Sequence, residues 1–149
     1  MAFPIFEYCV ICEVVRPELG GKFILLGFYG VAPNVEIAIP DINRPVFLSF
    51  IAGSGPIVDV TTSYDWVVAV SRPDGVTIFQ TPPQRLVVAE GKGVILPIGF
   101  NIAPPILTGR YSLRTLVNGD LKLDTSFAIR TGTPVLDINR QMSKASAPN

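Results

Sequence analysis

Histidine is absent from this 149-residue chain. The absence excludes Ser-His-Asp and Cys-His catalysis, acid–base catalysis by histidine, and metal sites built on imidazole. Ser-Lys or Thr nucleophiles stay formally open, but no spacing supports one. The glycine loops at 53–56 and 91–93 lack the spacing of a nucleophile elbow or a P-loop. We therefore predict that the protein is not an enzyme, with no catalytic residues, no cofactor-binding residues and no cofactor.

Charge is also scarce, because Asp, Glu, Lys and Arg make up 16% of the residues, against about 25% in an average globular domain. The 12 basic and 12 acidic residues balance, whereas a nucleic-acid-binding domain usually concentrates a basic excess on one face. The balance predicts no nucleic-acid partner. So apolar a composition has two explanations, a membrane segment or a surface that binds a partner.

Long apolar runs are missing as well. A spanning helix needs about 20 mostly apolar residues, and the best runs here, such as 23–30 and 93–102, lie among Gly, Pro or charged residues. The N-terminal segment has no basic region and reaches Glu7 and Glu13 early, unlike a signal peptide. These features predict a cytoplasmic protein with no membrane partner.

Cysteine occurs twice, as Cys9 and Cys12 in a CxxC spacing. A structural zinc site needs four ligands, and no further Cys or His is present to complete one. The motif lies in an apparent strand, where residues three apart point to opposite faces. We interpret both as packing residues, one in the core and one exposed or at an interface, and predict no metal site. A redox role, or a four-thiolate site shared by a dimer, is the alternative.

What the chain does contain is period-two alternation, punctuated by 14 Pro and 13 Gly, with no helical period sustained over three turns. Segments 22–30 and 45–52 are apolar on both faces, which predicts strands in the middle of a sheet or at an interface. In segment 93–102, Pro97 predicts an edge strand or a bulge. The first strand has one wholly apolar face, which we expect to meet the core: Phe6, Tyr8, Val10, Cys12 and Val14.

The two clearest turns follow from their residues. Arg72-Pro73-Asp74-Gly75 is a turn in which Pro presets φ and Gly supplies a positive φ. In the last hairpin, a three-residue loop at 118–120 keeps both apolar faces inward. It pairs Val117 with Leu121, and it places Arg114 opposite Asp124 on the outer face.

A few side chains are candidates for ligand binding. Trp66 with Tyr64, or Tyr29 with Phe28, could stack a sugar or another planar ligand. Trp66 alternates with Val68 and Val70, which favours the core. Carboxylate pairs such as Glu13 with Glu18, and Asp59 with Asp65, are interpreted as solvated charges.

Short strands at this spacing predict an all-β, immunoglobulin-like sandwich of about seven to nine mostly antiparallel strands. We expect a single domain over residues 1–133 and a flexible tail over 134–149. Segments 12–22 and 25–29, with Gly109-Arg110-Tyr111 and Asn118-Gly119-Asp120, resemble a family of small uncharacterised bacterial β-sandwich proteins, a domain of unknown function. The resemblance implies a sandwich and no catalytic residues. Tyr111 is a candidate corner tyrosine, whose hydroxyl ties a loop to the sheet.

The function predicted from these observations is a non-catalytic interaction or structural module. Its apolar strands would serve self-association into a homo-oligomer or a protein partner. The alternative is a small-molecule or carbohydrate-binding domain, which a concave patch carrying Tyr29 or Tyr64 would favour.

Overall fold

Ten β-strands and no helix make up residues 3–56 and 62–132, the part of the chain that the computed structural model describes. The strands are β1 (Phe6–Glu18), β2 (Lys22–Val31), β3 (Glu36–Ile39), β4 (Val46–Ser54), β5 (Thr62–Ser71), β6 (Thr77–Gln80), β7 (Gln84–Val88), β8 (Ile95–Ile102), β9 (Gly109–Val117) and β10 (Asp120–Thr131). The predicted tail, 134–149, falls outside these residues. Within them, no helix is long and apolar enough to cross a membrane.

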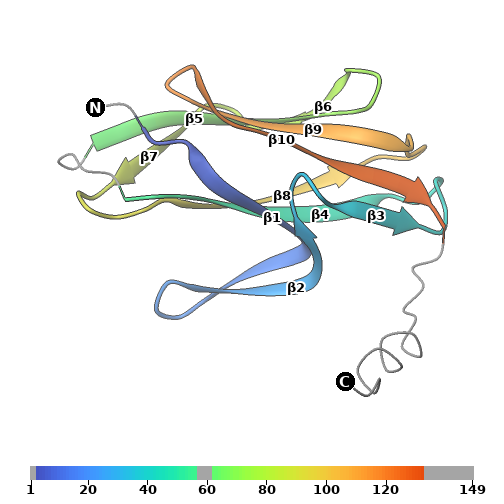
Figure 1. The fold of residues 1–149 in the computed structure, drawn as a ribbon, viewed down its shortest axis with the longest axis horizontal. Coiled ribbons are helices and arrows are strands. Elements are labelled where there is room, and N and C mark those ends of the chain that lie inside the picture. The colour runs from blue at the N-terminus through green and yellow to red at the C-terminus, as the bar shows by residue number, and fades with distance from the viewer. Residues whose placement is uncertain (1–2, 57–61, 133–149) are drawn as a thin grey trace, which may run out of the picture.

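The strands form two sheets that lie face to face (Figure 1). One has the order β2-β1-β4-β8, and the other β3-β10-β9-β5-β6 with β7 also paired to β5. All pairs are antiparallel except β3 with β10. This arrangement confirms the predicted all-β sandwich, with ten strands rather than seven to nine. We call the first the four-stranded sheet and the second the large sheet.

Aromatic side chains join the two sheets across the core. The Phe100 ring on β8 lies 6.4 Å from the Phe50 ring and 6.2 Å from the Phe127 ring on β10, measured between centroids. The inward face predicted for β5 is confirmed, since Trp66, Val68 and Val70 are all buried. Contacts of this kind fix the separation of the two layers, because interiors are close-packed.

Tyr111 is the predicted corner tyrosine. It lies near the start of β9, is fully buried, and stacks on the Phe127 ring at 5.3 Å between centroids. Its hydroxyl donates a hydrogen bond of 2.8 Å to the carbonyl oxygen of Leu107, four residues upstream. The bond ties the β8–β9 connection to the large sheet, as a corner tyrosine does in immunoglobulin-like domains.

In the β9–β10 hairpin, the predicted loop length is wrong but most of the predicted register is present. The loop has two residues, because Asn118 and Gly119 both adopt positive φ (50° and 82°) and Val117 pairs with Asp120. Asn-Gly is the preferred sequence for such a tight turn. A bulge between Leu121 and Leu123 then restores the expected pairing of Arg114 with Asp124.

The predicted core face of β1 is wrong in part. Phe6 is buried as expected, but Tyr8 and Val14 are exposed, while Cys9 and Ile11 enter the core. The pairing with β4 shifts between Phe6 and Tyr8. A bulge of this kind moves the following side chains to the opposite face, so strict alternation from Phe6 assigns them wrongly.

Candidate functional site: an apolar sheet face and an adjoining pocket

The outer face of the four-stranded sheet is apolar. Val10 pairs with Ile51 and Cys12 with Ser49; Ile51 and Cys12 are buried yet lie outside the core cluster, which places them on the side facing away from the large sheet. We define the apolar face by the large exposed side chains that share this side: Tyr8, Val14, Ile24, Leu26, Phe28, Val31, Phe47 and Ile95. Among the paired residues of this face, charge occurs only at the β1–β2 tip.

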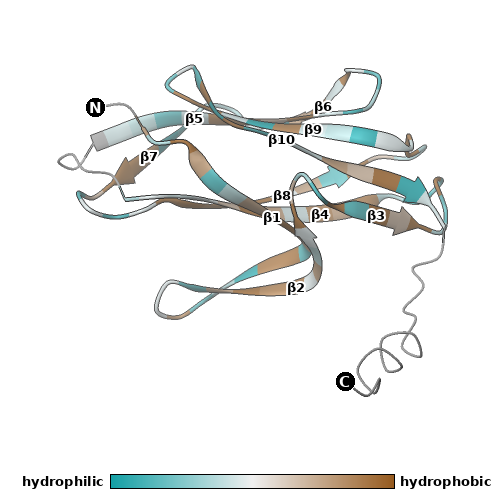
Figure 2. Ribbon diagram, viewed as in Figure 1, coloured by the Kyte–Doolittle hydropathy of each residue, from teal (hydrophilic) through white to brown (hydrophobic). Residues whose placement is uncertain are grey.

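Three of these eight side chains, Val14, Ile24 and Leu26, lie on a two-stranded arm. Pairing of β1 with β4 ends at Cys12, and from Val14 to Glu18 the strand pairs with β2 alone. Figure 1 shows the arm leaving the sandwich, and Figure 2 shows brown, apolar residues along it. A lone two-stranded hairpin is only marginally stable in water. An arm with large apolar side chains on its surface is therefore well suited to being covered by a partner.

The two edges of the four-stranded sheet differ. At one edge, β8 carries Pro97, which lacks a backbone N–H and fits the predicted edge strand. At the other, β2 has ten residues and no proline. For segment 22–30 the mid-sheet alternative is wrong, because β2 is an edge strand with most of its residues exposed; the other alternative, a strand at an interface, stays a prediction. Segment 45–52 is mid-sheet as predicted, with β4 between β1 and β8.

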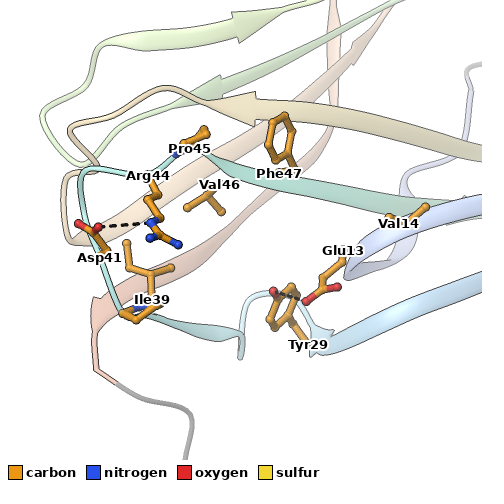
Figure 3. Close-up of a pocket in the computed structure, with 10 residues that line it drawn as sticks. Glu13, Val14, Tyr29, Ile39, Asp41, Arg44, Pro45, Val46 and Phe47 are labelled. Atoms are coloured by element: carbon orange, nitrogen blue, oxygen red, sulfur yellow. Dashed lines mark hydrogen bonds and ion pairs between the residues drawn. The ribbon is translucent and has the colours of Figure 1, made fainter.

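A pocket of about 400 Å³ opens where β1 and β4 diverge (Figure 3). Its walls are mostly apolar, including Ile39, Val46 and Phe47, and its polar groups are the side chains of Glu13, Tyr29, Asp41 and Arg44. The pocket thus joins the arm to the segment that connects β3 to β4. Sequence patterning could not find it, since its polar residues come from three segments that only the fold brings together.

The two cysteines are both buried, at 2% exposure for Cys9 and 0% for Cys12. As predicted, they point to opposite faces of the strand: Cys9 lies in the core and Cys12 on the outer side of the sheet, but Cys12 is covered by its neighbours rather than exposed. Burial raises the pKa of the Cys9 thiol to about 12 and also raises that of Cys12, with Glu13 as a second cause. Buried, protonated thiols are poor nucleophiles and metal ligands. Across residues 3–56 and 62–132, no three His, Cys, Asp or Glu side chains cluster to hold a metal.

The aromatic candidates separate into two groups. Trp66 and Tyr64 are buried in the core, and Tyr64 packs edge-on against Phe3. Tyr29 and Phe28 remain at the surface, and Tyr29 lines the pocket. Only this second pair can meet a ligand from solution.

The carboxylates also separate. Asp65 lies 3.8 Å from Arg85, and Glu18 lies 3.5 Å from Arg16, as exposed ion pairs. Asp59 falls outside the described residues. Glu13 instead lines the pocket, whereas Glu18, the carboxylate grouped with it from the sequence, lies near the arm tip outside the pocket.

Neither a family model nor a curated protein matches the sequence. Among solved structures, the fold is similar to the alkylpurine DNA glycosylase AlkC of Pseudomonas fluorescens, solved bound to DNA containing an abasic-site analogue. The similarity covers 64% of this chain at 15% sequence identity, with a TM-score of 0.45. This chain spans 27% of the length of that protein.

The exclusion of nucleic acid as a partner is corrected by this comparison. The similar structure is that of a protein bound to DNA, and the exclusion rested on charge balance alone. The physical reason is that net charge averages over the whole surface, so a neutral chain can still present a local basic region. At this degree of similarity the DNA belongs to the glycosylase, and it assigns no ligand to this chain.

Proposed function

We propose that the protein is a non-catalytic interaction module that associates with a second copy of itself through the apolar face. The observation that carries the proposal is the gathering of eight large exposed apolar side chains on one side of one sheet. Contiguous exposed apolar surface of this kind marks interaction sites on other proteins. Burying it contributes roughly 25 cal/mol per Å² of apolar area.

A second copy suits this face because of its charge. In a two-fold dimer the same patch meets itself, so a charge on the patch is buried without a partner unless an opposite charge of the same patch lies where it meets the second copy. The paired residues of the apolar face are uncharged from Tyr8 to Val14 and from Ile24 to Val31, and charge enters only at Arg16, Glu18 and Lys22 near the tip. The face can therefore pack on its own copy without burying an unpaired ion.

The compartment is part of the same proposal. Cys9 and Cys12 are free thiols, and unpaired cysteines are usual in the reducing cytoplasm. Cytoplasmic localisation and membership of a bacterial β-sandwich family stay predictions from the sequence.

The test is the native mass measured by light scattering over micromolar concentrations, for the natural chain and two variants. Leu26→Asp places a charge on the apolar face at a side chain that is 46% exposed. Leu121→Asp makes the same change on the large sheet at a side chain that is 49% exposed. We expect a dimer or larger assembly for the natural chain and for Leu121→Asp, and a monomer for Leu26→Asp.

Both variants should keep the β-sheet circular-dichroism spectrum, because neither side chain belongs to the core. A natural chain that stays monomeric at every concentration would refute self-association. Equal loss of assembly in both variants would refute the assignment to the apolar face.

The alternative function, a small-molecule-binding domain, has one observation in its favour. Tyr29 lies at a concave site, the pocket beside the arm, whereas Tyr64 and Trp66 are buried and cannot stack a ligand. The chemistry of that pocket supports a separate inference.

A further inference from the structure

The pocket between β1 and β4 is lined by the Glu13 carboxylate, whose position is fixed by contacts with neighbouring residues. Tyr29 donates a hydrogen bond from its hydroxyl to Glu13 Oε1 at 3.2 Å (Figure 3). Glu13 packs against Gly27, where an added Cβ would lie 2.5 Å from Glu13 Cδ. Gly27 also has a φ of +63°, which glycine adopts without strain. Both the tyrosine and the glycine thus hold Glu13 at the pocket.

The backbone of Glu13 is fixed as well. Ser49 on β4 donates from its hydroxyl to the Glu13 carbonyl oxygen at 3.3 Å. This bond lies at the point where β1 leaves β4, one residue beyond their last paired position. The carboxylate is therefore presented from an anchored strand.

The charges of the pocket do not cancel. Asp41 and Arg44 pair with each other, with 3.5 Å between Asp41 Oδ2 and Arg44 Nε. Glu13 forms no ion pair with any residue that the structure describes. The lining thus carries one net negative charge beside apolar walls, which disfavours an anion and favours a cation.

The aromatic groups favour the same ligand. Phe47 is largely exposed and lines the pocket together with Tyr29, and aromatic faces attract ammonium and guanidinium groups. Burial, followed by the neighbouring Glu13, raises the pKa of the Tyr29 hydroxyl. Tyr29 therefore stays protonated at neutral pH and continues to donate to Glu13.

We propose that this pocket binds an organic cation, with an ammonium or guanidinium group at Glu13 and an apolar body against Ile39, Val46 and Phe47. The cationic group would form a charge-assisted hydrogen bond to the carboxylate. The same chemistry is offered by a free amine and by a lysine or arginine side chain of another protein. This site is distinct from self-association, although Phe47 and Val14 border both.

The experiment is an NMR titration of the full chain with two probes, 2-phenylethylammonium and N-acetyl-lysine methylamide. The neutral 2-phenylethanol serves as the matched probe without charge. We expect saturable shifts of the Gly27 and Tyr29 amide signals with a cationic probe, and binding at least about tenfold weaker for the alcohol, as expected for a lost charge-assisted bond. Shifts from both cations would show that a protein side chain can supply the group, and shifts from the phenyl amine alone would assign the site to small molecules.

Two variants test the assignment to Glu13. Glu13→Gln keeps the shape and removes the charge, and we expect it to weaken binding of the cation at least about tenfold. Glu18→Gln makes the same change at the arm tip, outside the pocket, and should bind as the natural chain does. Equal binding of amine and alcohol, equal binding by Glu13→Gln and the natural chain, or no binding of either cation would overturn the proposal.

The titration is repeated on Leu26→Asp, whose side chain does not line the pocket. Binding that persists there shows a cation site that is independent of the oligomeric state. A failure of self-association and a failure of cation binding are thereby separate results.

Discussion

The two sheets bury similar inner faces but present different outer faces to solvent. On the large sheet, the outer face carries charged pairs: Arg114 with Asp124 at 3.3 Å, Arg85 with Asp65 at 3.8 Å, and Arg130 with Glu36. On the four-stranded sheet, the outer face is apolar over most of its paired residues. The low charge content of the chain is therefore not spread evenly. Charged pairs lie on the outer face of the large sheet, and large exposed apolar side chains gather on the outer face of the four-stranded sheet, which is the surface that the proposed self-association would cover.

The largest expected effect separates a buried leucine from an exposed one. Leu113 lies on the inner face of the large sheet and is fully buried, so Leu113→Ala should lower the free energy of unfolding by about 2–5 kcal/mol. Leu26→Ala, on the apolar face, should change it by no more than about 0.5 kcal/mol. Urea unfolding at the lowest workable protein concentration measures both. Equal losses would show that the apolar face is part of a monomeric core.

A second prediction concerns the inner side of the four-stranded sheet at high pH. The folded pKa of Cys9, about 12, lies above its ordinary value of 9.0. The stability from the protonated thiol is thus complete below pH 9 and is lost as the pH rises toward 12. Relative to pH 8, the natural chain should lose about 2–3 kcal/mol more at pH 11 than Cys9→Ala does.

Urea unfolding of the two chains at pH 8 and pH 11 measures that difference. Alanine at this position leaves a small cavity, whose cost is the same at both pH values and cancels. Parallel losses in the two chains would contradict the burial of this thiol.

A smaller effect tests the tie between the large sheet and its loop. Tyr111→Phe removes the hydroxyl that bonds Leu107 and keeps the ring stacked on Phe127. The loss should be about 1 kcal/mol, which lowers the melting temperature by about 2–4 °C. Differential scanning calorimetry measures the melting temperatures of both chains. An unchanged melting temperature would show that the Tyr111 hydroxyl does not act as a corner tie.

The smallest effect belongs to the charged outer face. A double-mutant cycle on Arg114 and Asp124, with alanine at each position, should give a coupling of about 0.2–1 kcal/mol that declines with salt. Both side chains are more than half exposed, so screening is strong. A coupling well above this range would mean that ion pairs stabilise the large sheet, and that its outer face contributes more than solubility.

Much of the fold follows from local patterns. Alternation predicts the inward residues of β5, and turn chemistry predicts the turn at Arg72–Gly75, where Gly75 has a φ of +87°. The corner tyrosine follows from the expected sandwich class. The Arg114–Asp124 pairing was predicted too, although the loop length was not. Local physics decides such features, because backbone sterics and side-chain alternation act within a few residues.

The candidate sites depended on tertiary structure. The bulge after Phe6 reverses which side chains of β1 enter the core, and nothing in the alternation from Phe6 to Val14 marks it. That β2 is an edge strand, and that Glu13 meets Tyr29 and Phe47 in one pocket, depends on where β1 leaves β4. An apolar residue on a two-sided strand satisfies the same pattern whether a neighbouring layer or a partner covers it. Composition therefore determined that the chain is rich in apolar residues. Only the packing of the two sheets decided which of these residues stay exposed, because that packing sets which face of each strand is buried.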